Sequence, residues 1–310
     1  MKKIVVCLCI VIAAGYGIRE FFYIGLVSNK AGIFDKFNTI FNKQNNFETL
    51  ILGSSRAESH YNCSMIDSVL HTNTFNLGIE GATMSFSLDI LDAYLEKSKC
   101  PSTIILNIDY NFPQCDNDTI FMFPRYFPYL KNQTLYNALN KRDYRFAGFR
   151  YFPFYSLPFM GDKFLAVAFR GYLNKPGQYD LNFKNGYSPL SPLNYVPPEQ
   201  WRFEPTYACN DDKFYQRLNL FIGFCKKNRI RLCIVESPMY YKKEEQILNR
   251  VEFKRKILKI AQLNHIVLLD YSTDSLCNHK NYFADPAHMN EEGSTLFTAK
   301  LVKDIIPFFN

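Results

Sequence analysis

The sequence lacks the short motifs of several common protein classes. Its nine cysteines include no C-x-x-C pair, which argues against a zinc ribbon and against a thioredoxin-type site. It contains no Gly-x-Ser-x-Gly elbow, so a conventional α/β-hydrolase is disfavoured. Gly53 is not followed by the glycine spacing that a pyrophosphate-binding turn needs, and this disfavours a dinucleotide-binding enzyme.

Metal-ligand patterns are also scarce. Asp285 and His288 form a close pair, but no third ligand stands at a recognisable spacing, so we expect neither a metal nor another cofactor. The cysteines are spread along the chain, and Cys225 and Cys233 lie in apolar contexts typical of small core residues. An exported domain would permit a disulfide, although the sequence indicates no particular pairing.

The charge pattern does not indicate a nucleic-acid partner. The chain of 310 residues has 36 Lys+Arg and 29 Asp+Glu, a formal net charge of +7. The basic residues are scattered, and short groups such as residues 254–256 are typical of a solvated helix face, whereas a nucleic-acid site needs a concentrated stripe. With 47% apolar residues, the chain can form a substantial core in one or two domains.

The N-terminus has the pattern of a membrane anchor. Lys2 and Lys3 precede an uncharged, mostly apolar run at 4–18, and a second apolar piece follows at 21–27. No convincing cleavage point is present, and flanking lysines can extend a short span. We therefore expect residues 1–27 to form an uncleaved signal-anchor helix, with the lysines inside and the body exported, periplasmic or extracytoplasmic. The alternative is a buried N-terminal helix of a cytosolic protein.

Apolar strands alternate with helices over most of the chain. Because the strands are continuously apolar, they are typical of a parallel sheet covered on both faces. We predict an α/β fold with a doubly wound, flavodoxin-like parallel sheet of five strands in a domain at 48–310, preceded by a juxtamembrane connector at 28–47. Its ligand site is expected beyond the carboxyl ends of the strands. The predicted strands are 49–52, 74–77, 103–108, 232–235 and 265–270, and the predicted helices are 57–70, 82–95, 211–227, 242–263 and 290–306.

A long aromatic-rich insertion interrupts this alternation at about 112–208. It is dense in Tyr, Phe and Pro, and one helix, 161–172, is recognisable in it. A segment this long inside a domain is either functional or contains structure that its pattern does not reveal. Its aromatic residues are expected mainly to pack against the protein, while stacking on sugar rings and lining an apolar slot are the alternatives.

Three polar stretches fall at the same predicted edge of the sheet. Gly53-Ser54-Ser55 ends the first strand, residues 76–83 follow the second, and residues 283–288 precede the last helix. A serine hydroxyl needs an adjacent base, and that base needs a fixed tautomer, which Asp and His three residues apart can supply. A serine at a helix N-terminus also offers its own N–H to a developing oxyanion. Taken singly, the serines could be helix caps and the other stretches turns.

These stretches resemble the SGNH/GDSL hydrolase superfamily, especially its membrane-anchored bacterial members associated with acylation of cell-envelope polymers. The resemblance covers roughly Glu48 to the C-terminus without the insertion. Placing the family's Gly-Asp-Ser-Leu turn on residues 53–56 implies that Ser55 is the nucleophile, with Ser54 replacing the usual Asp. The family's Asp-x-x-His block implies that Asp285 is the orienting acid and His288 the general base. No role is assigned to the other histidines, of which His60 lies close to the nucleophile turn.

The resemblance also implies an oxyanion hole. Its donors would be the N–H groups of Ser55 and Gly81 and the side chain of Asn111. The family's Gly-x-Asn-Asp block is altered here to Asn107-Ile108-Asp109-Tyr110-Asn111, and Asn107 lies within a predicted strand. Absence of a side-chain donor would cost about 3 kcal/mol of transition-state stabilisation.

The expected function is that of a serine esterase or O-acyltransferase, acting through an acyl-enzyme on acylated envelope or surface glycans. The glycan comes from the resemblance and the anchor, and the sequence does not separate hydrolysis from transfer. One alternative is a non-catalytic envelope protein that uses this fold to bind glycan or a partner acyltransferase in the membrane. Another is a lipid esterase of the lysophospholipase type.

Overall fold

The computed structural model describes residues 1–309 except for 110–119, 178–182, 191, 193–194 and 209–210. Packing divides the chain into two compact units. Unit 1 comprises Met1–Gln44, Asp92–Lys97 and Asp118–Phe183, and unit 2 comprises Asn45–Leu91, Ser98–Asn117 and Lys184–Asn310. Part of the aromatic insertion therefore packs with the N-terminal residues in unit 1, while the rest belongs to unit 2.

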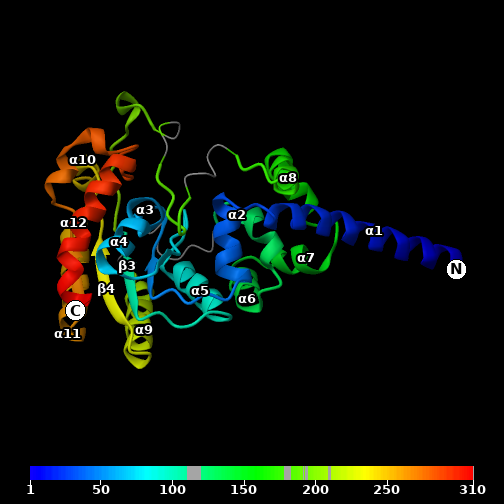
Figure 1. The fold of residues 1–310 in the computed structure, drawn as a ribbon, viewed down its shortest axis with the longest axis horizontal. Helices are drawn as coiled ribbons and strands as arrows, with labels where there is room; N and C mark the ends of the chain where they lie inside the picture. The colour runs from blue at the N-terminus through cyan, green and yellow to red at the C-terminus, as the bar shows by residue number, and fades with distance from the viewer. Residues whose placement is uncertain (110–119, 178–182, 191, 193–194, 209–210, 310) are drawn as a thin grey trace. The chain divides into compact units, whose positions relative to one another are not determined.

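Unit 2 is built on a sheet of five parallel strands in the order β2-β1-β3-β4-β5. Figure 1 labels the neighbouring strands β3 and β4. This strand order confirms the doubly wound, flavodoxin-like topology, and each strand lies within two residues of its predicted range. The strand order reverses between β1 and β3, so the carboxyl ends of these two strands border the expected ligand site. The strands are β1 (Thr49–Leu52), β2 (Thr74–Asn76), β3 (Thr103–Asn107), β4 (Arg231–Glu236) and β5 (Val267–Asp270).

The core of unit 2 lies on both faces of this sheet. Alternate strand residues such as Ile51 and Ile105 join a buried cluster with Tyr61 from the segment after β1 and Phe297 from the last helix. The intervening residues, such as Leu106, are also fully buried, as expected for strands whose two faces are both covered. This double burial is the physical reason for the continuous apolar runs in the sequence.

Two predicted helices of unit 2, 57–70 and 242–263, are each divided into two helices in the structure. The predicted helix 57–70 is broken at Tyr61, and the Asn62 side chain accepts the Met65 N–H at 3.2 Å to cap the second piece. Thr298 holds the break by accepting the Asn62 N–H and donating to the His60 carbonyl. The helices are α3 (Ser55–His60), α4 (Cys63–Leu70), α5 (Met84–Leu95), α9 (Asp212–Lys227), α10 (Tyr241–Glu244), α11 (Arg250–Asn264) and α12 (Glu291–Phe309), with 3-10 turns at Pro198–Gln200, Ser275–Asn278 and Lys280–Tyr282.

Unit 1 is helical, and its insertion segment contains more helix than the sequence indicates. Aromatic rings pack on one another across several helix faces, including Phe123, Phe127 and Phe149. Such a cluster gives no single apolar period, which explains why one helix alone was recognisable. The elements are α1 (Lys2–Val27), α2 (Gly32–Phe37), a π-helix at Asn38–Asn42, a 3-10 helix at Phe123–Tyr129, α6 (Gln133–Arg142), α7 (Arg145–Tyr151) and α8 (Leu157–Tyr172), which is kinked at Gly161.

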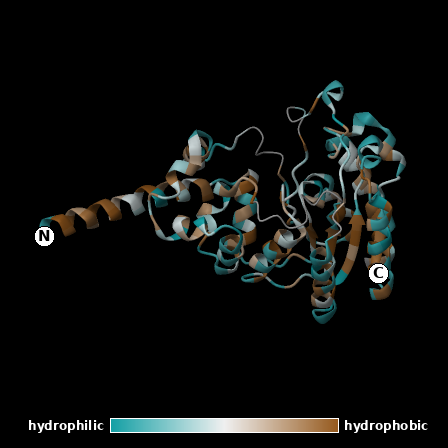
Figure 2. Cartoon of the chain, turned by 180° about the vertical axis from the view of Figure 1, so that it is seen from behind, coloured by the Kyte–Doolittle hydropathy of each residue, from teal (hydrophilic) through white to brown (hydrophobic). Residues whose placement is uncertain are grey.

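Among the described residues, α1 is the one helix long and apolar enough to cross a membrane. Its N-terminal half is exposed. This half is also strongly apolar, as the hydropathy colours of Figure 2 show. Only 11% of its most apolar stretch is buried within the protein. This length and composition fit a membrane span, and they equally fit a signal sequence.

The seven described cysteines form no disulfide bond with one another. Cys225 and Cys233 are buried, as their apolar sequence contexts indicate, and burial raises the pKa of each thiol to about 12. Cys115 and Cys209 lie outside the described residues.

The chain passes very close to α3 just after β2. Leu77 donates its N–H to the Ile51 carbonyl at 2.8 Å, and this brings Gly78 against the backbone of α3. A Cβ at Gly78 would lie 2.6 Å from the Glu58 nitrogen, closer than real Cβ atoms approach. A glycine is required here because the nearest atoms are backbone atoms of α3 and the Ala57 Cβ, which do not move aside easily.

We predict that Gly78→Ala destabilises the protein by about 1–3 kcal/mol, because the added methyl group overpacks a rigid contact. The free energy of unfolding in urea measures this effect. Gly223→Ala is the matched control, since a Cβ there meets nothing within 4 Å inside α9. The control is expected to be neutral or to stabilise by up to about 1 kcal/mol. Equal effects of the two changes would contradict the close-contact interpretation.

Candidate active site

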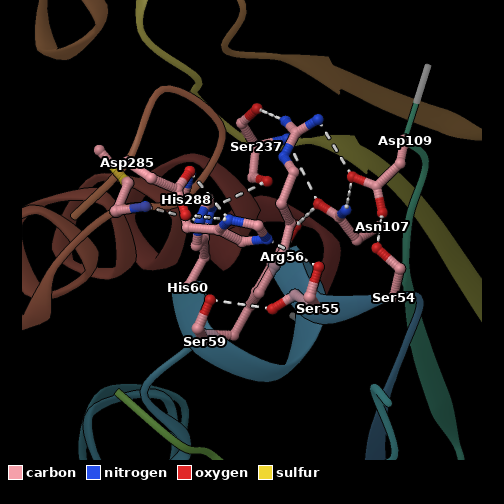
Figure 3. A network of polar contacts seen from close by, with 12 residues as sticks. Ser54, Ser55, Arg56, Ser59, His60, Asn107, Asp109, Ser237, Asp285 and His288 are labelled. Carbon is pink, nitrogen blue, oxygen red and sulfur yellow. Dashed lines mark hydrogen bonds and ion pairs between the residues drawn. The ribbon is translucent and has the colours of Figure 1, made fainter. Parts of the chain in front are cut away.

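The two adjacent serines after β1 have different partners (Figure 3). Ser54 precedes α3 but makes no capping hydrogen bond, and its hydroxyl donates to the Asp109 carboxylate instead. Ser55 is the first residue of α3, and its Oγ lies 2.7 Å from Nε2 of His288. The structure therefore joins the predicted nucleophile, and not its neighbour, to the predicted base.

His288 is held by a short turn that contains Asp285. Its Nδ1 lies 2.8 Å and 3.0 Å from the two Asp285 carboxylate oxygens. The backbone N–H groups of Ala287 and His288 also donate to Asp285 Oδ1, at 2.7 Å and 3.0 Å. The spacing of three residues thus lets one carboxylate bind both the ring and the backbone of the turn.

The electrostatics of this turn fix the tautomer of His288. Burial raises the pKa of Asp285, but the hydrogen bond and charge of His288 and the two backbone N–H donors outweigh it, so the pKa lies below its usual value. An ionised carboxylate at Nδ1 assigns the ring proton to that nitrogen. Nε2 is then left as an acceptor facing the Ser55 hydroxyl.

A second histidine, His60, connects α3 to the same turn. The Met289 N–H donates to His60 Nε2 at 2.9 Å, so the proton of the neutral ring is on Nδ1, which lies 3.1 Å from Ser237 Oγ. Burial, followed by the charges of Arg56 and His288, lowers the pKa of His60 well below its ordinary value. His60 is therefore a neutral acceptor that holds the residue next to His288. Its place five residues after Ser55 was the one sequence signal for it.

A buried ion pair lies behind the nucleophile turn. Arg56 is 4% exposed, and its Nη1 lies 3.0 Å from Asp109 Oδ1. The guanidinium also donates to the Ser237 carbonyl after β4. Burial lowers the pKa of Arg56, but the carboxylates of Asp109 and Glu236 outweigh it and raise the pKa. The pair connects the segments after β1, β3 and β4, and sequence reasoning missed it.

Asn107 belongs to this network and points into the protein, as expected for a residue inside a strand. Its Nδ2 donates to Asp109 Oδ1 at 2.9 Å, and its Oδ1 accepts from the Tyr61 hydroxyl at 2.5 Å and from the Ser237 N–H at 3.3 Å. With its amide occupied in this way, Asn107 supports the site from behind. Asn111, the predicted side-chain donor, lies outside the described residues.

Of the two predicted backbone donors, Ser55 is the first residue of α3 and Gly81 lies in a separate turn. Gly81 has a positive φ of 73° in the turn between β2 and α5, and the Glu80 N–H in this turn donates to Glu58 at 3.0 Å. In the described part of the chain, no hydrogen bond uses the N–H of Ser55 or Gly81. Because α3 has only six residues, these N–H groups and not a helix dipole would support an oxyanion.

The arrangement can activate a hydroxyl group as a nucleophile. Ser55, His288 and Asp285 form one hydrogen-bonded chain, in the order that a serine nucleophile, its base and an orienting acid require. Within the described ranges, no group of three or more His, Cys, Asp or Glu side chains is placed to hold a metal ion.

Among known proteins, only solved structures resemble this chain, and the resemblance is remote. No protein-family model and no curated protein matches the sequence. Similar solved structures include a protein assigned as an acylhydrolase from Bacteroides fragilis (11% identity, TM-score 0.44, covering 90% of this chain and 96% of that one). A GDSL-like lipase from Bacteroides thetaiotaomicron (11%, 0.38, 83% and 88%) and a protein assigned as a platelet activating factor from Streptococcus pneumonia (12%, 0.39, 100% of both chains) are also similar.

At these identities and TM-scores the likeness carries no argument about activity, which rests on the geometry of the site.

Proposed function

We propose that the protein is an SGNH-type ester hydrolase with Ser55 as nucleophile, His288 as general base and Asp285 as orienting acid. The observation that supports this most strongly is the contact of 2.7 Å between Ser55 Oγ and His288 Nε2. That distance lies within the range for proton transfer to a general base. The opposite ring nitrogen is bound by a carboxylate, which stabilises the imidazolium that forms.

The first half of the reaction makes an acyl-enzyme. Ser55 Oγ attacks the ester carbonyl while His288 Nε2 accepts the hydroxyl proton, and the N–H groups of Ser55 and Gly81 donate to the oxyanion. Collapse of the tetrahedral intermediate breaks the ester C–O bond, and the leaving alkoxide takes the proton from His288. The acyl group then remains on Ser55, and the site returns to its neutral state.

The acceptor in the second half decides the class of enzyme. Water activated by His288 gives hydrolysis, whereas a sugar hydroxyl at the same place gives O-acyl transfer. We propose an acylated envelope or surface glycan as the substrate, with the catalytic domain exported and anchored by α1. This choice is supported by the apolar helix Lys2–Val27 and by the resemblance of the site motifs.

Assaying acetylated glycans and lysophospholipids side by side tests the substrate class. Acetate released from the glycan, and not fatty acid released from the lysolipid, is the expected result. An added acceptor glycan that gains acetyl groups would identify transfer. Preferential cleavage of the lysolipid would contradict the glycan proposal and favour a lipid esterase.

We predict that a fluorophosphonate probe labels the natural protein and fails to label Ser55→Ala, because the probe reacts with an activated serine hydroxyl. Ser54→Ala is the matched control. It removes the adjacent hydroxyl and its bond to Asp109 but leaves the Ser55–His288 contact, so labelling should persist. Labelling that survives in Ser55→Ala would remove the nucleophile assignment.

We predict that Asp285→Asn lowers kcat by roughly 10²–10⁴, since an amide neither stabilises the imidazolium nor selects the required tautomer.

The pKa of Asp285 is lowered in the folded protein, so its stabilising contribution is present above about pH 4 and is lost as the pH falls through the folded pKa. Urea unfolding should therefore show that the difference in free energy of unfolding between the natural protein and Asp285→Asn becomes smaller as the pH is lowered. A gap that does not depend on pH would contradict this electrostatic role.

We predict that His60→Ala lowers kcat roughly 10- to 100-fold with little change in KM, because a poorly held His288 turn misplaces the base. The variant also leaves the buried Met289 N–H without its acceptor, at a cost of about 1–3 kcal/mol in the free energy of unfolding. His279→Ala, at an exposed histidine, is the control. A loss confined to stability, with normal kcat in the folded fraction, would contradict the positioning role.

A further inference from the structure

We propose that unit 1 carries an apolar collar around α1 that lies in the membrane interface. The collar consists of Tyr151, Phe152, Phe154, Phe169, Tyr172 and Leu173, which are between 42% and 65% exposed. Large apolar side chains gathered on one surface mark an interaction site. The occupant proposed here is the lipid bilayer, and the inference rests on the proposed anchoring by α1.

One side of the collar is fixed to the middle of α1. The Tyr16 hydroxyl donates to the Tyr151 carbonyl at 2.6 Å, and Arg19 donates to the Arg150 carbonyl at 3.1 Å. The Phe154 ring lies against Gly15 so closely that a Cβ there would be 2.4 Å from it. These contacts place the segment that follows α7 beside Gly15 and Tyr16.

The other side of the collar comes from the end of α8. The Tyr172 ring stacks on Phe21 with centroids 4.8 Å apart, and its hydroxyl donates to the Phe21 carbonyl at 2.6 Å. Gly25 and Gly171 let the two helix backbones touch, since a Cβ on Gly171 would lie 1.8 Å from the Gly25 oxygen. The two sides therefore meet α1 at Gly15 and Tyr16 and at Phe21 to Gly25, respectively.

The length of α1 requires the bilayer to reach this level. From Lys2 to Gly15 the helix rises about 20 Å, at 1.5 Å per residue. The hydrocarbon core of a bilayer is about 30 Å thick and needs about 20 helical residues. If α1 crosses the membrane, the first half alone is too short, and the outer boundary falls on the collar.

The chemistry of the collar suits that boundary. Tyr and Phe rings at membrane interfaces place an apolar body against lipid, and tyrosine adds a polar end. The charge of Arg19 at this level is shielded by protein, because Arg19 is 8% exposed and lies 4.8 Å from the Tyr16 ring centroid. The neighbouring Glu20 is paired with it at 3.0 Å. Exposed Arg170 and Lys175 at the end of α8 can meet lipid phosphates.

Depth-dependent fluorescence quenching tests the collar on the full-length chain in phosphatidylcholine–phosphatidylglycerol vesicles with brominated lipids. The single native tryptophan, Trp201, is buried in unit 2 and provides the baseline. Added tryptophans at Phe152→Trp and Leu173→Trp report on the collar. Ile10→Trp reports on the exposed half of α1, and Leu220→Trp, on the exposed face of α9, is the control. Unchanged fluorophosphonate labelling checks that each variant folds.

We expect the collar tryptophans to show blue-shifted emission and to lose intensity with bromine near the headgroups more than with bromine near the bilayer centre. Ile10→Trp should be quenched most by deep bromine, and Leu220→Trp should not be quenched. Quenching at Ile10 without quenching at both collar positions would overturn the collar and leave the anchor intact. No quenching at any position would overturn the anchor and the collar together, while labelling of Ser55 would still test the catalytic proposal.

A blue shift without bromine quenching would place the collar against protein. If that shift disappears when the protein-to-lipid ratio falls, the occupant is a second copy of the chain. Either result would overturn the bilayer as the occupant.

Discussion

The buried ion pair between Arg56 and Asp109 is the constraint on which the site depends. Moving two charges out of water costs several kcal/mol for each ion, and a contact of 3.0 Å with further hydrogen bonds must offset that cost. Removing one partner of such a pair typically costs about 3–5 kcal/mol, since the other charge stays buried. The pair therefore enforces one arrangement of the segments after β1, β3 and β4, and the nucleophile turn lies directly on it.

The proposed catalytic side chains are held by neutral groups or by groups whose hydrogen bonds are satisfied locally. Asp285 receives its hydrogen bonds from its own turn, and His60 stays uncharged because burial lowers its pKa. This separation has a physical benefit. The permanent charges of Arg56 and Asp109 hold the scaffold in one arrangement, while His288, the proposed base, faces a single carboxylate and a hydroxyl.

Local patterns in the sequence were sufficient to predict the sheet and to predict that Ser55, Asp285 and His288 lie close together. Continuous apolar strands need no knowledge of distant partners, and parallel strands bring their carboxyl ends to one edge. The capping interpretation of Ser54 fails because a nearby carboxylate competes successfully for its hydroxyl. The break at Asn62 depends on Thr298, more than 200 residues away, so no local pattern reveals it.

The supporting network was hidden from the sequence for the same reason. His60 binds Met289 and Ser237, which lie far from it in the sequence. Asp109 likewise pairs with Arg56 from another part of the chain. The helices of the insertion were missed because rings pack on several of their faces and leave no single apolar period. Asn111 lies outside the described residues, so the side-chain donor stays a prediction.

The second half of α1 is hydrophobic, and it also packs inside unit 1. Tyr23 and Leu26 are buried, and Gly25 fits against Gly171. Trimming the first 27 residues to obtain a secreted or soluble form would open the interior of this unit and expose the helix face that α8 presents to it. Removal of this segment by a signal peptidase would therefore conflict with the packing of unit 1.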